Sequence, residues 1–314
     1  MSAAKLLSLG AAVKSAAAVA VKSMVLPGIA GTGALHVTEH VLKVPVDHSD
    51  HSAFPPIDVF VREVCLASKA DEEQPYLLYL QGGPGFPSPR PTCPPSGWMH
   101  AALSKNFRVL LLDQRGTGRS SPITAESLTS LECLDAEPER MAAYLSHFRA
   151  DSIVRDCELV REAVAKGKKL TLLGQSFGGF CILTYLSNFP NAVERALFTF
   201  GLAPTERSAE EVYTATFKRM EERNRRFYRR YPGDIELVRS IVAALHIEPV
   251  PLPRGGTLTV RRFLQLGALL GSASGMETLH DLLEGARAAW GDGPALPVNF
   301  LIAVENAQVR RDRR

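Results

Sequence analysis

Residues 170–180, LTLLGQSFGGF, constrain the fold of this 314-residue chain more than any other segment. A short apolar run typical of a buried strand ends at Gly174, and an apolar stretch of helical type follows Gly178. Ser176 stands between the two glycines, which have no side chain to keep the strand and the helix apart. The segment therefore predicts a strand, a sharp turn and a helix, with the hydroxyl of Ser176 exposed on a strained turn.

Segments of strand type alternate with segments of helical type through the first two-thirds of the chain. Strands are predicted at 38–46, 57–67, 75–80, 107–113, 170–174 and 193–201. Helices are predicted at 97–106, 138–148, 151–167 and 176–189. Because a helix between two strands returns the chain to the same end of the sheet, this alternation predicts an α/β fold with a parallel sheet.

The pattern changes after Pro204, where helical periodicity replaces the alternation. Helical segments are predicted at 208–231, 234–246, 260–271, 275–290 and 297–307, with a break at 250–259. No buried parallel strand is evident in the sequence after residue 201. We therefore expect three parts: an N-terminal targeting or disordered extension (1–35), an α/β core (36–204) and a helical cap (205–314).

Composition excludes several classes of protein. With 46% apolar and 22% charged residues, the chain has enough apolar material for a core and is not of the disordered type. A net charge of +3 indicates no nucleic-acid partner, and no apolar run is long enough to span a membrane. The loop at 46–52, VDHSDHS, contains His48 and His51, but no further ligands cluster nearby, so we expect a polar loop and no metal site.

The first 35 residues are rich in alanine and serine, and no acidic residue precedes Glu39. This composition is typical of an organellar transit peptide, and a disordered extension without an address is the alternative. Five cysteines without a CxxC pair favour a reducing compartment. We expect the cytoplasm, or a plastid or mitochondrion if the N-terminal segment is a transit peptide.

Three glycine-rich turns each follow a predicted buried strand: QGGPG at 81–85, DQRGTGRS at 113–120 and GQSFG at 174–178. Functional groups of an open α/β sheet gather at the carboxyl ends of its strands, so we expect these turns to lie close together. Ser176 is then a candidate nucleophile. The Phe177 N–H and an N–H of the QGGPG turn are candidate donors to an oxyanion, each worth about 3–4 kcal/mol in a transition state.

These motifs, with the stretch RADSIVRDCELVRE, resemble those of the proline iminopeptidases, the prolyl aminopeptidase family of α/β hydrolases, from about residue 38 to about residue 306. The resemblance implies an α/β-hydrolase core with a helical cap insertion, and release of N-terminal proline from small peptides without a metal or cofactor. It implies that Ser176 attacks the carbonyl and that Gly83 and Phe177 donate to the oxyanion. It also implies that Glu305, in FLIAVEN, binds the substrate amine; the alternative for Glu305 is an exposed helix carboxylate.

A serine nucleophile needs a histidine base and an acid, which follow the serine along the chain in α/β hydrolases. Only His246 and His280 follow Ser176, and neither comes after a predicted core strand. The acid and histidine of the resembling family lie beyond its cap. We therefore expect a chain that stops within the cap and lacks the last core strands. Three hypotheses stay open: a serine aminopeptidase, an esterase on the same fold, and a truncated, inactive hydrolase-like protein.

Overall fold

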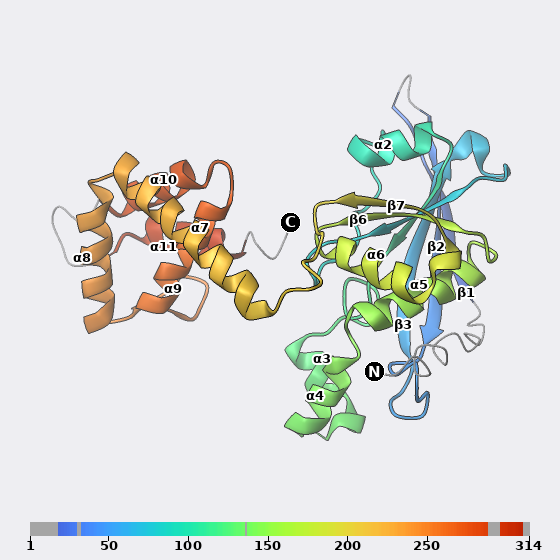
Figure 1. Ribbon diagram of the computed structural model, residues 1–314, viewed down its shortest axis with the longest axis horizontal. Helices are drawn as coiled ribbons and strands as arrows, with labels where there is room; N and C mark the ends of the chain where they lie inside the picture. The colour runs from blue at the N-terminus through green and yellow to red at the C-terminus, as the bar shows by residue number, and fades with distance from the viewer. Residues whose placement is uncertain (1–17, 30–32, 136, 288–295, 310–314) are drawn as a thin grey trace. The chain divides into compact units, whose positions relative to one another are not determined.

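The computed structural model describes residues 18–29, 33–135, 137–287 and 296–309. They belong to two compact units, Met1–Ala203 and Pro204–Arg314. The first unit contains one seven-stranded sheet covered by helices, and the second is mostly helical (Figure 1). Among the described residues, no helix combines the length and the apolarity that crossing a bilayer requires.

The sheet of the first unit begins antiparallel and continues parallel. Its strands are β1 (Ala18–Leu26), β2 (Leu35–Val44), β3 (Ile57–Leu66), β4 (Tyr76–Leu80), β5 (Arg108–Leu112), β6 (Leu170–Gln175) and β7 (Val193–Thr199). They lie side by side in the order β1-β2-β3-β5-β4-β6-β7. The pairs from β1 to β5 are antiparallel, and β5, β4, β6 and β7 are mutually parallel. The predicted parallel α/β sheet is confirmed for these four strands.

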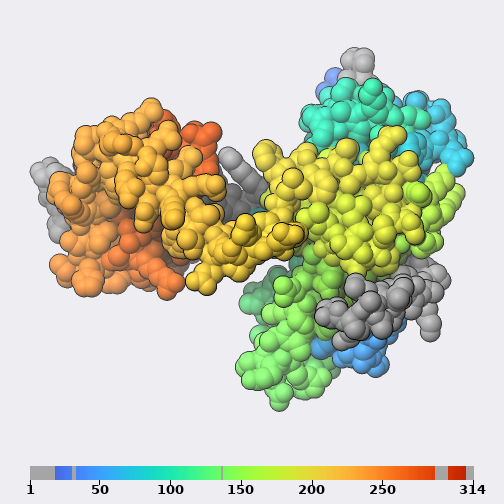
Figure 2. Space-filling view, in the orientation of Figure 1, coloured from blue at the N-terminus to red at the C-terminus, as the bar shows by residue number. Residues whose placement is uncertain are grey.

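Helices cover both faces of this sheet, which makes three layers (Figure 1). In the space-filling view of Figure 2, residues in the yellow-green to yellow colours of α5 and α6 form much of the visible surface of this unit. The helices are α2 (Gly97–Ser104), α3 (Ala125–Ser130), α4 (Pro138–Ser146), α5 (Ala150–Ala163) and α6 (Phe177–Asn188), with short 3-10 turns η2 (Ala67–Lys69), η3 (Glu132–Leu134) and η4 (Pro190–Ala192). Alternate residues of β4 enter different cores, because successive strand side chains point to opposite faces. Leu77 and Tyr79 pack with Met99 of α2, whereas Leu78 packs with Ile182 of α6.

The strand β1 corrects the expectation for the N-terminal extension. Residues 18–26, expected to lie outside the core, pair with β2 from Ala18↔Leu42 to Leu26↔Leu35. The backbone groups of β2 that would otherwise line an open edge are satisfied by this pairing. The expectation of a disordered segment is therefore wrong for residues 18–26, whereas a targeting role of the N-terminal segment stays a prediction. Residues 1–17 lie outside the described residues.

The second unit packs its helices around an apolar core. Its elements are α7 (Ala209–Arg230), α8 (Asp234–Ile247), β8 (Val250–Pro251), β9 (Thr257–Leu258), α9 (Val260–Leu264), the 3-10 helix η5 (Gln265–Gly271), α10 (Gly275–Arg287) and α11 (Val298–Val309). Phe227, Ile241, Phe263 and Phe300 lie in the core. The predicted helices are confirmed where they are described, but β8 and β9 form a small hairpin where only a break was expected.

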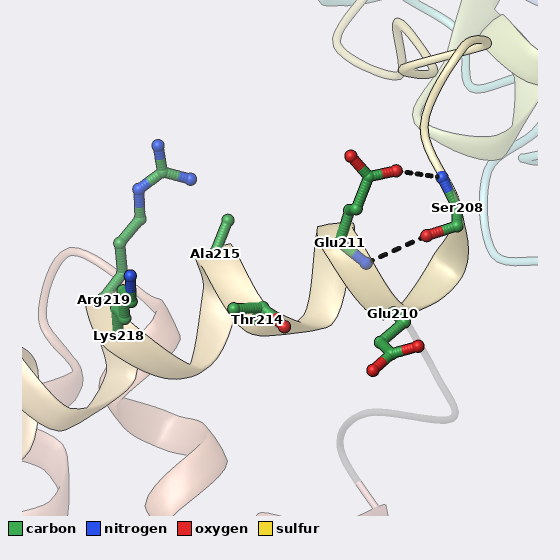
Figure 3. A pocket seen from close by; sticks show the side chains of 7 residues that line it. All are labelled: Ser208, Glu210, Glu211, Thr214, Ala215, Lys218 and Arg219. Carbon is green, nitrogen blue, oxygen red and sulfur yellow. Dashed lines mark hydrogen bonds between the residues drawn. The ribbon is translucent and has the colours of Figure 1, made fainter.

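The long helix α7 begins at a capping box (Figure 3). The N–H of Glu211 donates to Ser208 Oγ (3.2 Å), and the N–H of Ser208 donates to Glu211 Oε2 (2.8 Å). Both bonds satisfy backbone donors that a helix leaves free at its start. The exposed side of this helix carries ion pairs such as Arg229 with Glu222 (3.0 Å), which are typical of a solvated surface.

A buried ion pair joins the DQRGTGRS turn to α5. Arg115 Nε and Nη2 donate to the two carboxylate oxygens of Asp156 at 2.7 and 2.6 Å, and both side chains are fully buried. His48 Nε2 lies 2.9 Å from Asp156 Oδ1. Burial alone raises the pKa of Asp156, but Arg115 and His48 outweigh it and hold this pKa below its ordinary value. The ion pair therefore fixes the turn that follows β5.

We predict that Asp156→Asn lowers the free energy of unfolding of the first unit by about 3–5 kcal/mol, because the substitution leaves Arg115 as a buried charge without a counter-ion. The matched control is Asp135→Asn, which removes an exposed pair with Arg140 and costs at most about 1 kcal/mol. Native-state hydrogen exchange of β4 and β6 measures both values. Equal losses of unfolding free energy in the two variants would contradict the role given to the buried pair of Arg115 and Asp156.

Candidate active site

The parallel strands bring the three glycine-rich turns together at the carboxyl ends of β5, β4 and β6. β4 lies between β5 and β6, and the registers pair Tyr79 with Leu111 and Leu80 with Gly174. The chain therefore leaves β5 at Asp113, β4 at Gln81 and β6 at Ser176 on the same side. The expectation that these turns lie close together is confirmed.

Ser176 occupies the turn between β6 and α6 in a conformation that non-glycine residues rarely adopt. Its φ is 53° and its ψ is −113°. The backbone is held on both sides, since the Ser176 N–H donates to Thr199 O (3.1 Å) and its carbonyl accepts the Gly179 N–H (2.8 Å). A backbone of this kind costs about 1–3 kcal/mol and persists only where its surroundings impose it. The strained turn predicted from the sequence is thus present.

Glycines around Ser176 allow three segments to meet at this turn. A Cβ on Gly178 would overlap the carbonyl oxygen of Leu80, and a Cβ on Gly174 would overlap that of Gly178. Gly201, which follows β7, has a φ of +77°, and a Cβ there would overlap the carbonyl oxygen of Ser176. Gly201 was not among the predicted site residues. It was the last residue of the predicted strand 193–201, and a glycine at the end of a strand was the available signal.

The two candidate oxyanion donors lie in segments that touch the turn. Phe177 is the first residue of α6, so its N–H has no acceptor within the helix and points out of the positive helix end. A Cβ on Gly82 would lie 3.1 Å from Ser176 Cβ, which places the QGGPG turn against the serine. Gly83 follows with a φ of +129°. The structure thus brings Ser176, Phe177 and the segment that contains Gly83 together.

The carboxylate of Asp113 supports the segment that follows QGGPG. It accepts the N–H of Ser88 (3.0 Å) at one oxygen and the N–H of Arg119 (3.0 Å) at the other. Burial of this side chain raises the pKa of Asp113 above its ordinary value despite these two bonds. Asp113 therefore joins the segment that follows QGGPG to its own turn.

The two histidines considered as bases lie in the second unit. His246 is exposed near the end of α8. His280 Nδ1 lies 2.8 Å from the fully buried Asp234, its Nε2 lies 3.5 Å from Glu284, and its ring stacks on Tyr231 at 3.8 Å. With a carboxylate at each nitrogen, His280 joins α8 to α10. Among the described residues of the first unit, no histidine is hydrogen-bonded to Ser176 Oγ.

Glu305 lies on α11 and is only 3% exposed, so the alternative of an exposed helix carboxylate is wrong. Its Oε1 accepts the backbone N–H of Arg254 (3.1 Å). Its Oε2 is buried and has no hydrogen-bond partner among the described residues. A buried carboxylate oxygen without a donor is costly, which makes it a candidate to bind a cation.

The loop with two histidines and two aspartates is bonded internally. Asp47 accepts the N–H and the hydroxyl of Ser49 (2.7 and 2.6 Å), and Asp50 bonds Ser52 in the same way. His48 lies instead at the buried pair of Arg115 and Asp156. These bonds are those of a polar loop. In the part of the chain that the structure describes, no cluster of three or more histidine, cysteine, aspartate or glutamate side chains has the arrangement of a metal site.

A family model described as the alpha/beta hydrolase fold matches residues 75–234, which include all three turns. Together with the sheet and the strained Ser176 turn, this match shows that the chain belongs to the α/β hydrolase family. The chain is similar to a proline iminopeptidase from Aeromonas sobria, at 48% identity over 252 residues, which are 80% of this chain and 58% of the relative. The resemblance noted in the sequence is thereby confirmed.

A second relative is a proline iminopeptidase from Aspergillus aculeatus, which is 37% identical over 260 residues and covers 81% of this chain and 56% of the relative. The chain therefore spans between 56% and 58% of the length of these two relatives. An epoxide hydrolase structure from Vigna radiata is 15% identical, covers 51% of this chain and 41% of that chain, and has a TM-score of 0.32.

We predict that Ser176→Gly is about 1 kcal/mol more stable to unfolding than Ser176→Ala. Both changes remove the hydroxyl, but only glycine relieves the strained backbone, worth about 1–3 kcal/mol. Glycine also has more conformational freedom in the unfolded chain, which lowers the stability of Ser176→Gly by about 0.4–1 kcal/mol. Native-state hydrogen exchange of β6 measures the difference in free energy of unfolding between the two variants. A more stable alanine variant would contradict the claim that the backbone of Ser176 is strained.

Proposed function

We propose that this protein is a serine aminopeptidase that releases N-terminal proline from small peptides. The strained Ser176 between β6 and α6, with the QGGPG turn against it, is the observation that carries the proposal. The similarity to two proline iminopeptidases supports the choice of substrate. An esterase on the same fold is the competing hypothesis, and the substrate profile distinguishes an aminopeptidase from an esterase.

In the proposed reaction, Ser176 Oγ attacks the carbonyl carbon of the N-terminal proline and gives a tetrahedral intermediate. The N–H groups of Phe177 and Gly83 donate to its oxyanion. Collapse breaks the peptide bond, and the departing amine takes a proton. Water then hydrolyses the prolyl ester on Ser176 and releases proline. The hydroxyl proton must pass to a general base, and neither His246 nor His280 is assigned that role.

Glu305 is the proposed site for the substrate amine. An N-terminal proline carries a protonated secondary amine, and this cation can donate to the buried oxygen Oε2 that lacks a partner among the described residues. Such a bond is possible only with a free N-terminus, which would restrict the enzyme to the first residue of a peptide. We expect no nucleic-acid or membrane partner.

The proposed compartment is the cytoplasm, or a plastid or mitochondrion if the N-terminal residues form a transit peptide. The pairing of β1 limits where such a peptide can be cut, because removal of residues 18–26 would leave the edge of β2 open. We therefore place any processing site before Ala18.

We predict that the full chain hydrolyses proline 4-nitroanilide and that Ser176→Ala lowers kcat at least about 10⁴-fold, because the alanine cannot form the prolyl ester. A matched ester, 4-nitrophenyl acetate, tests the competing esterase. Circular dichroism of both proteins controls for folding. Hydrolysis of the ester alone would replace the aminopeptidase by an esterase, and a folded chain that cleaves neither substrate would favour the inactive hydrolase-like protein.

We also predict that Glu305→Gln raises KM for proline 4-nitroanilide about 10- to 100-fold, because the amide removes the negative charge that binds the substrate amine. Oε1 is retained in the amide, so the bond from the Arg254 N–H is kept. The control is Glu248→Gln, an exposed carboxylate of the same unit. An unchanged KM in the Glu305 variant would remove Glu305 from the substrate site.

A further inference from the structure

The side chain of Gln114 connects two of the three turns at the candidate site. Gln114 belongs to the DQRGTGRS turn and is 1% exposed. Its Nε2 donates to the carbonyl oxygen of Gln81, at 3.0 Å, in the QGGPG turn. Because β5 and β4 are neighbours, this bond crosses between residues 33 positions apart in the sequence.

The backbone of Gln114 is fixed by its own turn. The carbonyl of Gln114 accepts both the N–H of Thr117 (3.0 Å) and the Thr117 hydroxyl (2.7 Å). The buried pair of Arg115 and Asp156 holds the next residue. The amide of Gln114 therefore extends from a rigid segment and can impose a position on the group that it bonds.

Gln81 is held at two points. Its carbonyl accepts from Gln114, and its side-chain Oε1 accepts from the hydroxyl of Tyr79 (2.8 Å), whose ring stacks on Trp98 at 4.4 Å. The Gln81 carbonyl and the Gly82 N–H share one planar peptide group, so fixing the carbonyl fixes that plane. Gly82 in turn lies against Ser176.

The glycines that follow cannot fix this plane themselves, since glycine adopts positive and negative φ almost equally. Gly83 has a φ of +129° and Gly85 a φ of +104°, both in the region open mainly to glycine. A turn of this composition needs outside contacts to keep one conformation. The bond from Gln114 is a buried contact of this kind at the start of the turn.

We propose that Gln114 is a positioning residue that holds the QGGPG turn so that the Gly83 N–H faces the oxyanion formed at Ser176. The inference rests on the proposed function for its catalytic consequence, and on the hydrogen bond to Gln81 for its structural part. Gln114 itself touches neither the substrate nor the reacting atoms.

Three variants of the full chain test the proposal. Gln114→Met keeps the length of the side chain and removes the donor. Gln114→Glu keeps the shape and offers an acceptor to a carbonyl oxygen. The control, Gln74→Met, removes a buried glutamine of the same unit whose Nε2 donates to Asn106, away from the three turns. Each variant is measured by kcat and KM on proline 4-nitroanilide and by hydrogen exchange of residues 81–86.

We expect Gln114→Met to lower kcat about 10- to 100-fold with KM unchanged, because a misplaced oxyanion donor weakens binding of the transition state alone. Exchange at 81–86 rises at least about tenfold in this variant, and Gln74→Met changes neither quantity. The activity of Gln114→Glu, expressed as a ratio to that of the parent chain, is expected to rise as the pH falls. Burial raises the pKa of a carboxyl group, and the protonated carboxyl can donate to the carbonyl oxygen of Gln81.

The proposal is overturned if exchange at 81–86 in Gln114→Met equals that of the parent chain, or if both methionine variants lose kcat equally. Should the parent chain cleave no proline amide, the proposed function fails, and faster exchange at 81–86 in Gln114→Met alone still supports the role in holding the turn. If Gln114→Met does not fold, the pH dependence of Gln114→Glu tests the proposal. A ratio of its kcat to that of the parent chain that does not change with pH overturns the proposal.

Discussion

The parallel pairing of β5, β4 and β6 is the constraint on which the candidate site depends. It places the starts of three turns at neighbouring positions of one sheet edge. The close approach of Gly178 to the carbonyl of Leu80 then seats α6 directly beside the end of β4. The candidate nucleophile Ser176 after β6, the candidate donor Phe177 of α6 and the QGGPG turn after β4 are thus positioned by backbone packing before any side chain contributes.

The strained backbone of Ser176 is held in place by hydrogen bonds and by the neighbouring turns. The backbone of Ser176 costs about 1–3 kcal/mol, and it is held by its bonds with Thr199 and Gly179. The adjoining turn after β5 is fixed by the pair of Arg115 and Asp156, and through Gln114 that rigidity reaches the QGGPG turn. The sheet edge is therefore preorganised, as stabilisation of an oxyanion requires.

Local patterns carried most of the predictable structure. The buried strands and the glycine turns at 81–85 and 174–178 follow from apolar runs and glycine spacing. The strand β1 was missed because its alanine-rich surroundings hid a segment whose order comes from pairing with β2. Gly201, the bond from Gln114 to Gln81 and the burial of Glu305 depend on contacts between distant residues, which no local pattern encodes. The base for Ser176 was not found in the sequence, and neither histidine of the second unit is assigned to it.

The most direct test of the central claim, an activated Ser176, is labelling of the folded full chain with a fluorophosphonate, followed by peptide mapping. The account predicts one adduct, on the peptide that contains Ser176, and no adduct in Ser176→Ala. Such an adduct requires a base to take the serine proton. A folded chain that forms no adduct, or that forms one at another serine, would contradict the assignment of Ser176 as the nucleophile.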